Sequence, residues 1–184
     1  MQIIVPKRFV FPTYPLFFLA GPIRGGGDWQ AQMYQVLKRL LPESTGMVAC
    51  PCRWGRDPEH PLAREFVKGN EERFPHQLDW ERYYLERAAF DGEPGCIIFW
   101  LPLESKTNPH PGPEPYAMDT RGELGEWRGR MVLSRPRVVI GADPAFLGLS
   151  QIRRNFSAVT EYEFPIYPTM EETAHAAIKL AYKP

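Results

Sequence analysis

The chain has 184 residues, of which 43% are hydrophobic and 24% are charged, a composition typical of a globular domain and not of a disordered segment. Lys plus Arg and Asp plus Glu both total 22, so the formal net charge is zero and no nucleic acid polymer is expected as a partner. No apolar run is long enough to cross a bilayer and no segment resembles a targeting signal, so we expect no membrane association.

In chain order, residues 14–20 form a continuous apolar run that predicts a buried strand, and a glycine-rich turn follows at 21–27. Asp28 is placed to cap a helix that extends to about residue 41. The pattern then predicts a strand at 47–50, a helix at 74–89, a strand at 96–101, a helix at about 121–133, a strand at 137–140, a strand near 164–167 and a helix at 171–182.

Twenty prolines interrupt this pattern, mainly at 51–75 and 102–115. Proline lacks a backbone donor and fixes φ, so neither stretch is expected to form a regular element. Long, stiff loops in a compact domain are more often functional than idle.

Strands that alternate with helices predict a single α/β domain over residues 1–184, a three-layer sandwich with a mainly parallel sheet of about five strands. In such sheets ligands bind at the carboxyl ends of the strands. The loop after Ala20, the loop after Leu101 and the start of the helix that holds Glu123 are therefore expected to converge.

The cysteines give no sign of a disulfide or a metal centre. Cys50, Cys52 and Cys96 cannot all pair within one chain, and Cys50 and Cys52 are too close for the usual zinc spacing. The four histidines are scattered. We expect reduced thiols, a cytoplasmic setting and no metal.

The glycine-rich turn contains Gly21-Pro22-Ile23-Arg24-Gly25. Its glycines let the backbone approach a ligand, and the following helix start offers free amide groups. Arg24 adds a guanidinium suited to a carboxylate or a phosphate. The turn indicates a sugar or phosphate pocket, and the alternative is a flexible turn before a helix.

Glu123 lies near the predicted start of a helix, where the helix dipole favours the ionised, nucleophilic carboxylate. Gly122 and Gly125 leave room for a substrate on either side. The alternative is structural, because Thr120 and Glu123 have the spacing of a capping box.

Asp79 and Glu81 lie near the start of another predicted helix, most of whose charges belong to a solvated face. Either carboxyl could instead face the pocket and transfer a proton to a leaving group. One nucleophilic and one acidic carboxyl form the arrangement that retaining glycoside cleavage requires.

Four ordered motifs extend this interpretation: Phe18-Leu19-Ala20-Gly21-Pro22-Ile23, Trp80-Glu81, Ile98-Phe99-Trp100-Leu101-Pro102 and Thr120-Arg121-Gly122-Glu123-Leu124-Gly125-Glu126-Trp127. With them the chain resembles the nucleoside 2-deoxyribosyltransferase superfamily, most closely its nucleoside 2-deoxyribosyltransferase-like branch, over roughly residues 17 to 140. The glycine turn is also similar to the phosphate loop of a sister group, the 2'-deoxynucleoside 5'-phosphate N-hydrolases.

The resemblance implies a flavodoxin-like (Rossmann-like) fold and a double displacement without a cofactor. Glu123 falls on the nucleophilic glutamate of the family, which attacks the anomeric carbon and holds the deoxyribosyl group. Glu81 matches the acid that contacts the nucleobase, with Asp79 as an alternate. Further substrate contacts are implied for Phe18, Gly21, Pro22, Ile23, Arg24, Gly25, Trp100, Asp119, Thr120 and Gly122.

As partners the resemblance implies nucleosides or nucleotides and nucleobases, a role in nucleotide salvage and a homo-oligomer. Three functions stay open: deoxyribosyl transfer between bases, hydrolysis of a 2'-deoxynucleoside 5'-monophosphate, and a non-catalytic nucleotide-binding regulatory module. Arg24 favours the second. The third is motivated by Phe17 and Phe18, which stand where many family members carry a tyrosine.

Overall fold

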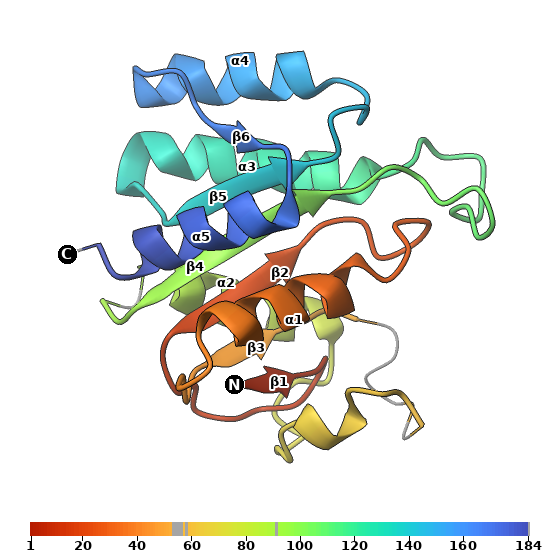
Figure 1. Ribbon diagram of the computed structural model, residues 1–184, viewed down its shortest axis with the longest axis vertical. Helices are drawn as coiled ribbons and strands as arrows, with labels where there is room; N and C mark the ends of the chain where they lie inside the picture. The colour runs from red at the N-terminus through yellow and green to blue at the C-terminus, as the bar shows by residue number, and fades with distance from the viewer. Residues whose placement is uncertain (53–56, 58, 91, 184) are drawn as a thin grey trace.

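The computed structural model describes residues 1–52, 57, 59–90 and 92–183 of the chain. Within these residues six strands form one sheet, in the order β1-β3-β2-β4-β5-β6, and every neighbouring pair is parallel (Figure 1). The strands are β1 (Gln2–Ile4), β2 (Leu16–Ala20), β3 (Met47–Ala49), β4 (Gly95–Leu101), β5 (Val138–Ala142) and β6 (Ile166–Tyr167).

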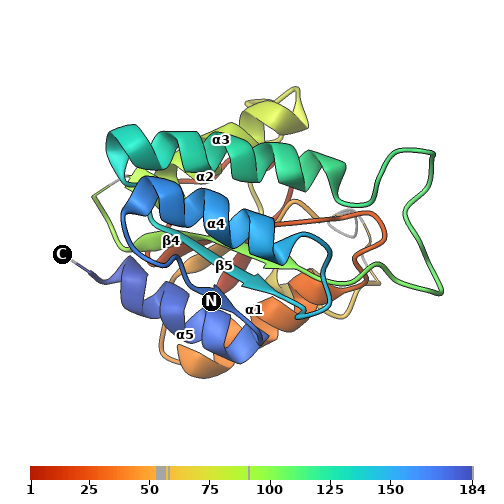
Figure 2. The ribbon, with the colours of Figure 1, turned by 90° about the horizontal axis from the view of Figure 1, so that it is seen from above.

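Helices cover both faces of the sheet and complete the predicted three-layer α/β sandwich of flavodoxin-like type (Figure 2). Three helices pack on one face: α2 (Gln77–Phe90), α3 (Met118–Ser134) and α4 (Leu149–Thr160). The other face is covered by α1 (Trp29–Leu40) and α5 (Met170–Ala181). The sheet has six strands, one more than the sequence predicts, because β1 adds an outer strand beside β3.

The central strands form where the sequence is apolar throughout. All five residues of β2 and all seven of β4 are buried, as helices on both faces require. Neighbouring residues of the two strands are in register, with Leu16 opposite Gly95 and Ala20 opposite Phe99. Both strands therefore end close together, at the edge where ligands bind in such sheets.

The sequence analysis does not predict two elements of the structure, β1 and α4. The strand β1 has only three residues. The helix α4 was missed although Leu149, Ile152, Phe156 and Val159 follow helical spacing. The prediction of no regular element in residues 51–75 is wrong at one place, because Ala63–Glu65 forms a short 3-10 helix. Residues 53–56 and 58 of this stretch lie outside the described residues. Residues 102–115 contain no helix or strand, as predicted.

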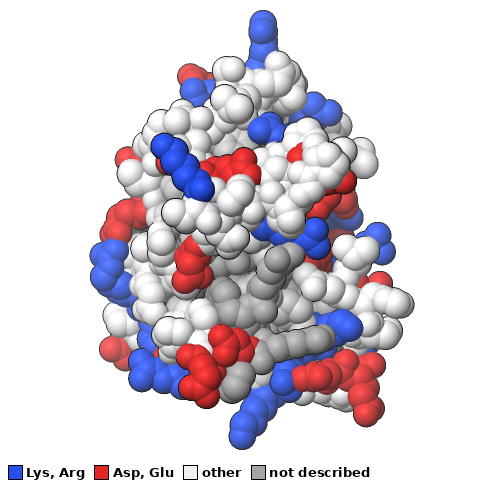
Figure 3. Space-filling model, turned by 90° about the vertical axis from the view of Figure 1, so that its right-hand side faces the viewer, with Lys and Arg blue, Asp and Glu red and all other residues white. Residues whose placement is uncertain are grey.

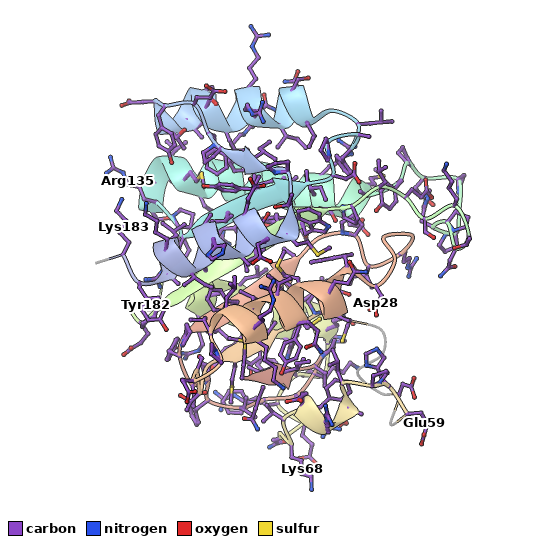
Figure 4. The ribbon with its side chains drawn as sticks, in the orientation of Figure 1. Asp28, Glu59, Lys68, Arg135, Tyr182 and Lys183 are labelled. Atoms are coloured by element: carbon purple, nitrogen blue, oxygen red, sulfur yellow. The ribbon has the colours of Figure 1, made fainter. Side chains whose placement is uncertain are left out.

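The order in which strands are added to the sheet reverses between β2 and β4. From β2 the chain passes through α1 to β3 on one side, whereas β4 lies on the other side of β2 and leads through α3 to β5. The loops that leave β2 and β4 consequently diverge, and in this class of fold ligands bind in the crevice between them. In Figure 4, Asp28 at the start of α1 marks this edge, and Arg135, Tyr182 and Lys183 lie at the opposite one.

No helix among the described residues is both long enough and apolar enough to cross a membrane.

Candidate active site

A cleft of about 890 Å³ opens at the carboxyl edge of the sheet, where the loops that leave β2 and β4 diverge. Its walls come from the segments that follow β1, β2, β3 and β4 and from the first two turns of α2 and of α3. Acidic and basic side chains are interspersed on this face of the molecule (Figure 3). The convergence that the strand order predicts is therefore present in the structure.

The cleft brings together eight of the residues that the sequence singles out. They are Gly21, Pro22, Ile23, Arg24, Glu81, Asp119, Thr120 and Glu123. They come from three separate parts of the chain, so the tertiary fold assembles them.

Five other candidates do not line the cleft. Phe18 and Trp100 are buried in the two hydrophobic cores, where Phe18 packs against Trp80. Gly25 lies behind the cleft wall against His110, and Gly122 has open space around its α-carbon. Asp79 lines a second, shallower hollow on the outer side of α2 together with Arg82 and Glu86.

Glu123 and Glu81 form a pair of partly buried carboxyl groups on neighbouring helices. Burial and then repulsion from Glu81 raise the pKa of Glu123 to about 7, and Asp119 adds to the repulsion. Burial also raises the pKa of Glu81, which accepts a hydrogen bond of 2.7 Å from the Gln77 amide. Because two close carboxylates repel each other, such a pair tends to retain one proton near neutral pH.

The capping-box interpretation of Glu123 is wrong. The helix α3 begins at Met118, and its N-cap is Ala117, a residue in the left-handed conformation with φ of 61°. Thr120 is a buried residue inside the first turn and caps nothing. Glu123 has no hydrogen-bond partner among the described residues, so no contact with the helix terminus explains this carboxyl.

The predicted effect of the helix dipole on Glu123 is also wrong. Glu123 lies in the second turn of α3, and the dipole acts mainly within the first turn. Burial and like charges outweigh it and shift the pKa upward instead of downward.

The glycine turn is held rigidly against the end of β4. A Cβ atom on Gly21, whose φ is 150°, would lie 2.3 Å from the carbonyl oxygen of Trp100. The Trp29 indole donates a 2.8 Å hydrogen bond to the Pro22 carbonyl. These contacts leave no place for a side chain at residue 21 and tie the start of the turn to the end of β4 and to α1.

The proline-rich loop after β4 covers one side of the cleft. The Ser105 amide donates a 2.6 Å hydrogen bond to the Gly25 carbonyl. A Cβ atom on Gly25 would lie 2.6 Å from the backbone nitrogen of His110. The His110 ring contacts the Glu104 carboxylate at 2.6 Å and the Glu114 carbonyl. Since His110 and Glu114 both line the cleft, these contacts fix the part of the loop that forms this side of it.

Two cationic side chains line the cleft besides the acidic groups: Arg24 and Lys7. Lys7 follows β1 and has a left-handed backbone with φ of 68°, and sequence reasoning missed it because it missed β1. Among the described residues, neither cation has an ion-pair partner. An unpaired cation in a cleft is available to an anionic ligand group.

No group of three or more His, Cys, Asp and Glu side chains in the described part of the chain is arranged to hold a metal ion. The three cysteines are buried, with free thiols.

No protein-family model matches the chain, and a search of curated proteins found no match. The chemistry of the cleft therefore has to carry the assignment of function.

Proposed function

We propose that the protein transfers a 2'-deoxyribosyl group between nucleobases by double displacement, with Glu123 as the nucleophile and Glu81 as the acid and base. The observation that carries this proposal is the pair of partly buried carboxyls in one cleft, from two helices and close enough to repel. Retaining glycoside cleavage uses a carboxyl pair of this kind. The ordered motifs that resemble the deoxyribosyltransferase superfamily support the same reaction.

In the first half-reaction, the Glu123 carboxylate attacks C1' of the deoxynucleoside. A bond forms between its oxygen and C1', and the bond between C1' and the base nitrogen breaks. The electron pair of that bond goes to the base, which takes the proton held by Glu81. This step needs an ionised Glu123 and a protonated Glu81. Repulsion keeps one proton on the pair near neutral pH, and because the larger pKa increase is that of Glu123, this proton has to pass from Glu123 to Glu81 before the attack.

In the second half-reaction, a nitrogen of another base attacks C1' and releases the Glu123 carboxylate. The Glu81 carboxylate takes the proton that the incoming base loses, so the enzyme returns to its starting state. Water in place of the base would give hydrolysis. His110 and Glu114 of the proline-rich loop line one side of the cleft, and closure of this loop over the bound sugar would exclude water and favour transfer.

A second candidate function is hydrolysis of 2'-deoxynucleoside 5'-monophosphates. Lys7 and Arg24 are the specific observation in its favour, because both line the cleft and neither has an ion-pair partner among the residues that the structure describes. If these cations bind the 5'-phosphate, the glycosidic bond at the other end of the sugar can face the two carboxyls. The carboxyl chemistry is the same, and the acceptor is water.

One assay compares the two functions. We expect a deoxynucleoside and a second free base to yield the exchanged nucleoside faster than free deoxyribose. If the 5'-phosphate is the natural group, the monophosphate reacts faster, and Arg24→Ala and Lys7→Ala each raise its KM by roughly tenfold, because each removes a charge-assisted contact.

Lys106→Ala is the matched control for this assay, since Lys106 is an exposed residue of the proline-rich loop that does not line the cleft. Equal rates for nucleoside and monophosphate, unchanged in both cation variants, would exclude the phosphate-specific function. Absence of both exchange and hydrolysis from a folded protein, across purine and pyrimidine substrates, would exclude both enzymatic functions.

A further inference from the structure

Two large apolar side chains at the cleft are left open to solvent. Leu78 is 63% exposed and Met118 is 56% exposed, and both line the cleft. Isolated exposed apolar residues are common on protein surfaces and by themselves indicate nothing. These two face the same cleft from different helices, and the helix packing does not use either side chain.

Their places on the helices relate them to the carboxyl pair. Leu78 precedes Glu81 by three residues on α2, so the two side chains share a helix face. Met118 is the first residue of α3 and lies one and a half turns before Glu123. The two helices are joined by the ion pair of Glu86 with Arg130 and by ring stacking of Phe90 on Trp127. Each carboxyl thus has a large apolar side chain on the N-terminal side of it in the same helix.

We propose that Leu78 and Met118 pack against the ring of the nucleobase and determine which bases the enzyme accepts. This inference rests on the proposed function. A nucleobase has flat apolar faces and polar edges, so it can bury these two side chains while its ring nitrogen reaches Glu81. No other described part of the cleft wall offers exposed side chains as large and apolar as these.

The identity of the two residues indicates broad acceptance of bases. Methionine is unbranched and adapts to ligands of different shape, and apolar contacts discriminate weakly between ring systems. A purine covers more of both side chains than a pyrimidine does, so purine substrates depend on them more.

The test measures steady-state exchange with a purine and a pyrimidine deoxynucleoside in Leu78→Ala, Met118→Ala and the double variant. We expect KM for the purine substrate to rise about tenfold in the double variant, with a smaller rise for the pyrimidine and kcat nearly unchanged. Leu133→Ala is the matched control, because Leu133 is 89% exposed at the far end of α3 and does not line the cleft. Unchanged KM values for both substrates in the double variant would overturn the proposal.

Binding of free adenine, measured by calorimetry, separates this inference from the proposed reaction. If exchange is absent but adenine binds and the double variant loses that binding, the proposed base site is supported and the proposed reaction is excluded. If exchange proceeds and the double variant binds adenine as tightly as the native chain, the proposed base site is excluded and the proposed reaction is supported. A change of oligomeric state with unchanged adenine affinity would assign the two side chains to a subunit contact and overturn the proposal.

Discussion

Glu123→Gln is expected to lower the rate of base exchange by about 10³-fold or more, because an amide cannot form the sugar-enzyme bond. The same substitution is expected to make the protein more stable above neutral pH. The native chain must ionise a mostly buried carboxyl beside Glu81, whereas glutamine carries no charge. A residue kept for catalysis and not for folding produces this opposition of activity and stability.

The direction of the stability change follows from the pKa values. The carboxyl of Glu123 titrates near 4.5 in the unfolded chain and at about 7 in the folded protein. Between these values the unfolded chain releases its proton first, so the free energy of unfolding falls as pH rises. The full shift corresponds to about 3 kcal/mol at pH 8.

Thermal unfolding of both proteins at pH 5 and pH 8 checks this prediction. We expect nearly equal stability at pH 5 and a more stable Glu123→Gln variant at pH 8. The matched control is Glu126→Gln, an exposed carboxyl on the same helix that pairs with Arg130 and does not line the cleft; it should retain exchange activity. A Glu123→Gln variant that is inactive and less stable at both pH values would indicate a structural role for the carboxyl.

Glu81→Gln is expected to lower kcat by about 10²- to 10⁴-fold with ordinary deoxynucleosides, the usual contribution of general acid catalysis. The departing base then leaves without a proton. A 7-methylpurine deoxynucleoside, whose base already carries a positive charge, should lose far less activity. Asp79→Asn is the matched control, since Asp79 lies on the same helix but outside the cleft.

The dependence of kcat/KM on pH gives a second test of the roles of Glu123 and Glu81. Only the singly protonated pair has one nucleophile and one acid, so kcat/KM of the native enzyme should be bell-shaped. It should fall as pH rises through about 7, where the pair loses its last proton. Glu81→Gln should abolish this alkaline decline. If the decline persists unchanged in that variant, Glu81 is not the acid.

The central strands and the location of the site could be predicted from the sequence, because both depend on local pattern. Continuous apolar runs identify β2 and β4, and parallel strands bring their carboxyl ends to one edge. Lys7 could not be predicted, since the three residues of β1 give no periodicity to recognise.

The choice between Asp79 and Glu81 could not be made from sequence either. Residues two apart on a helix point about 200° away from each other, so only one of them can face the cleft. Which one does depends on how α2 rotates to bury Trp80 and Tyr84 against the sheet. The pKa of Glu123 was likewise out of reach, because burial and Glu81 come from tertiary packing.

The most direct test of the central claim is mass spectrometry of the protein after incubation with a 2'-fluoro-2'-deoxynucleoside, whose fluorine slows the second half-reaction. We predict the mass of one fluorodeoxyribosyl group on the intact protein, located on Glu123 after peptide mapping and absent from Glu123→Gln. An adduct on another residue, or an identical adduct in Glu123→Gln, would contradict the assignment of Glu123 as the nucleophile.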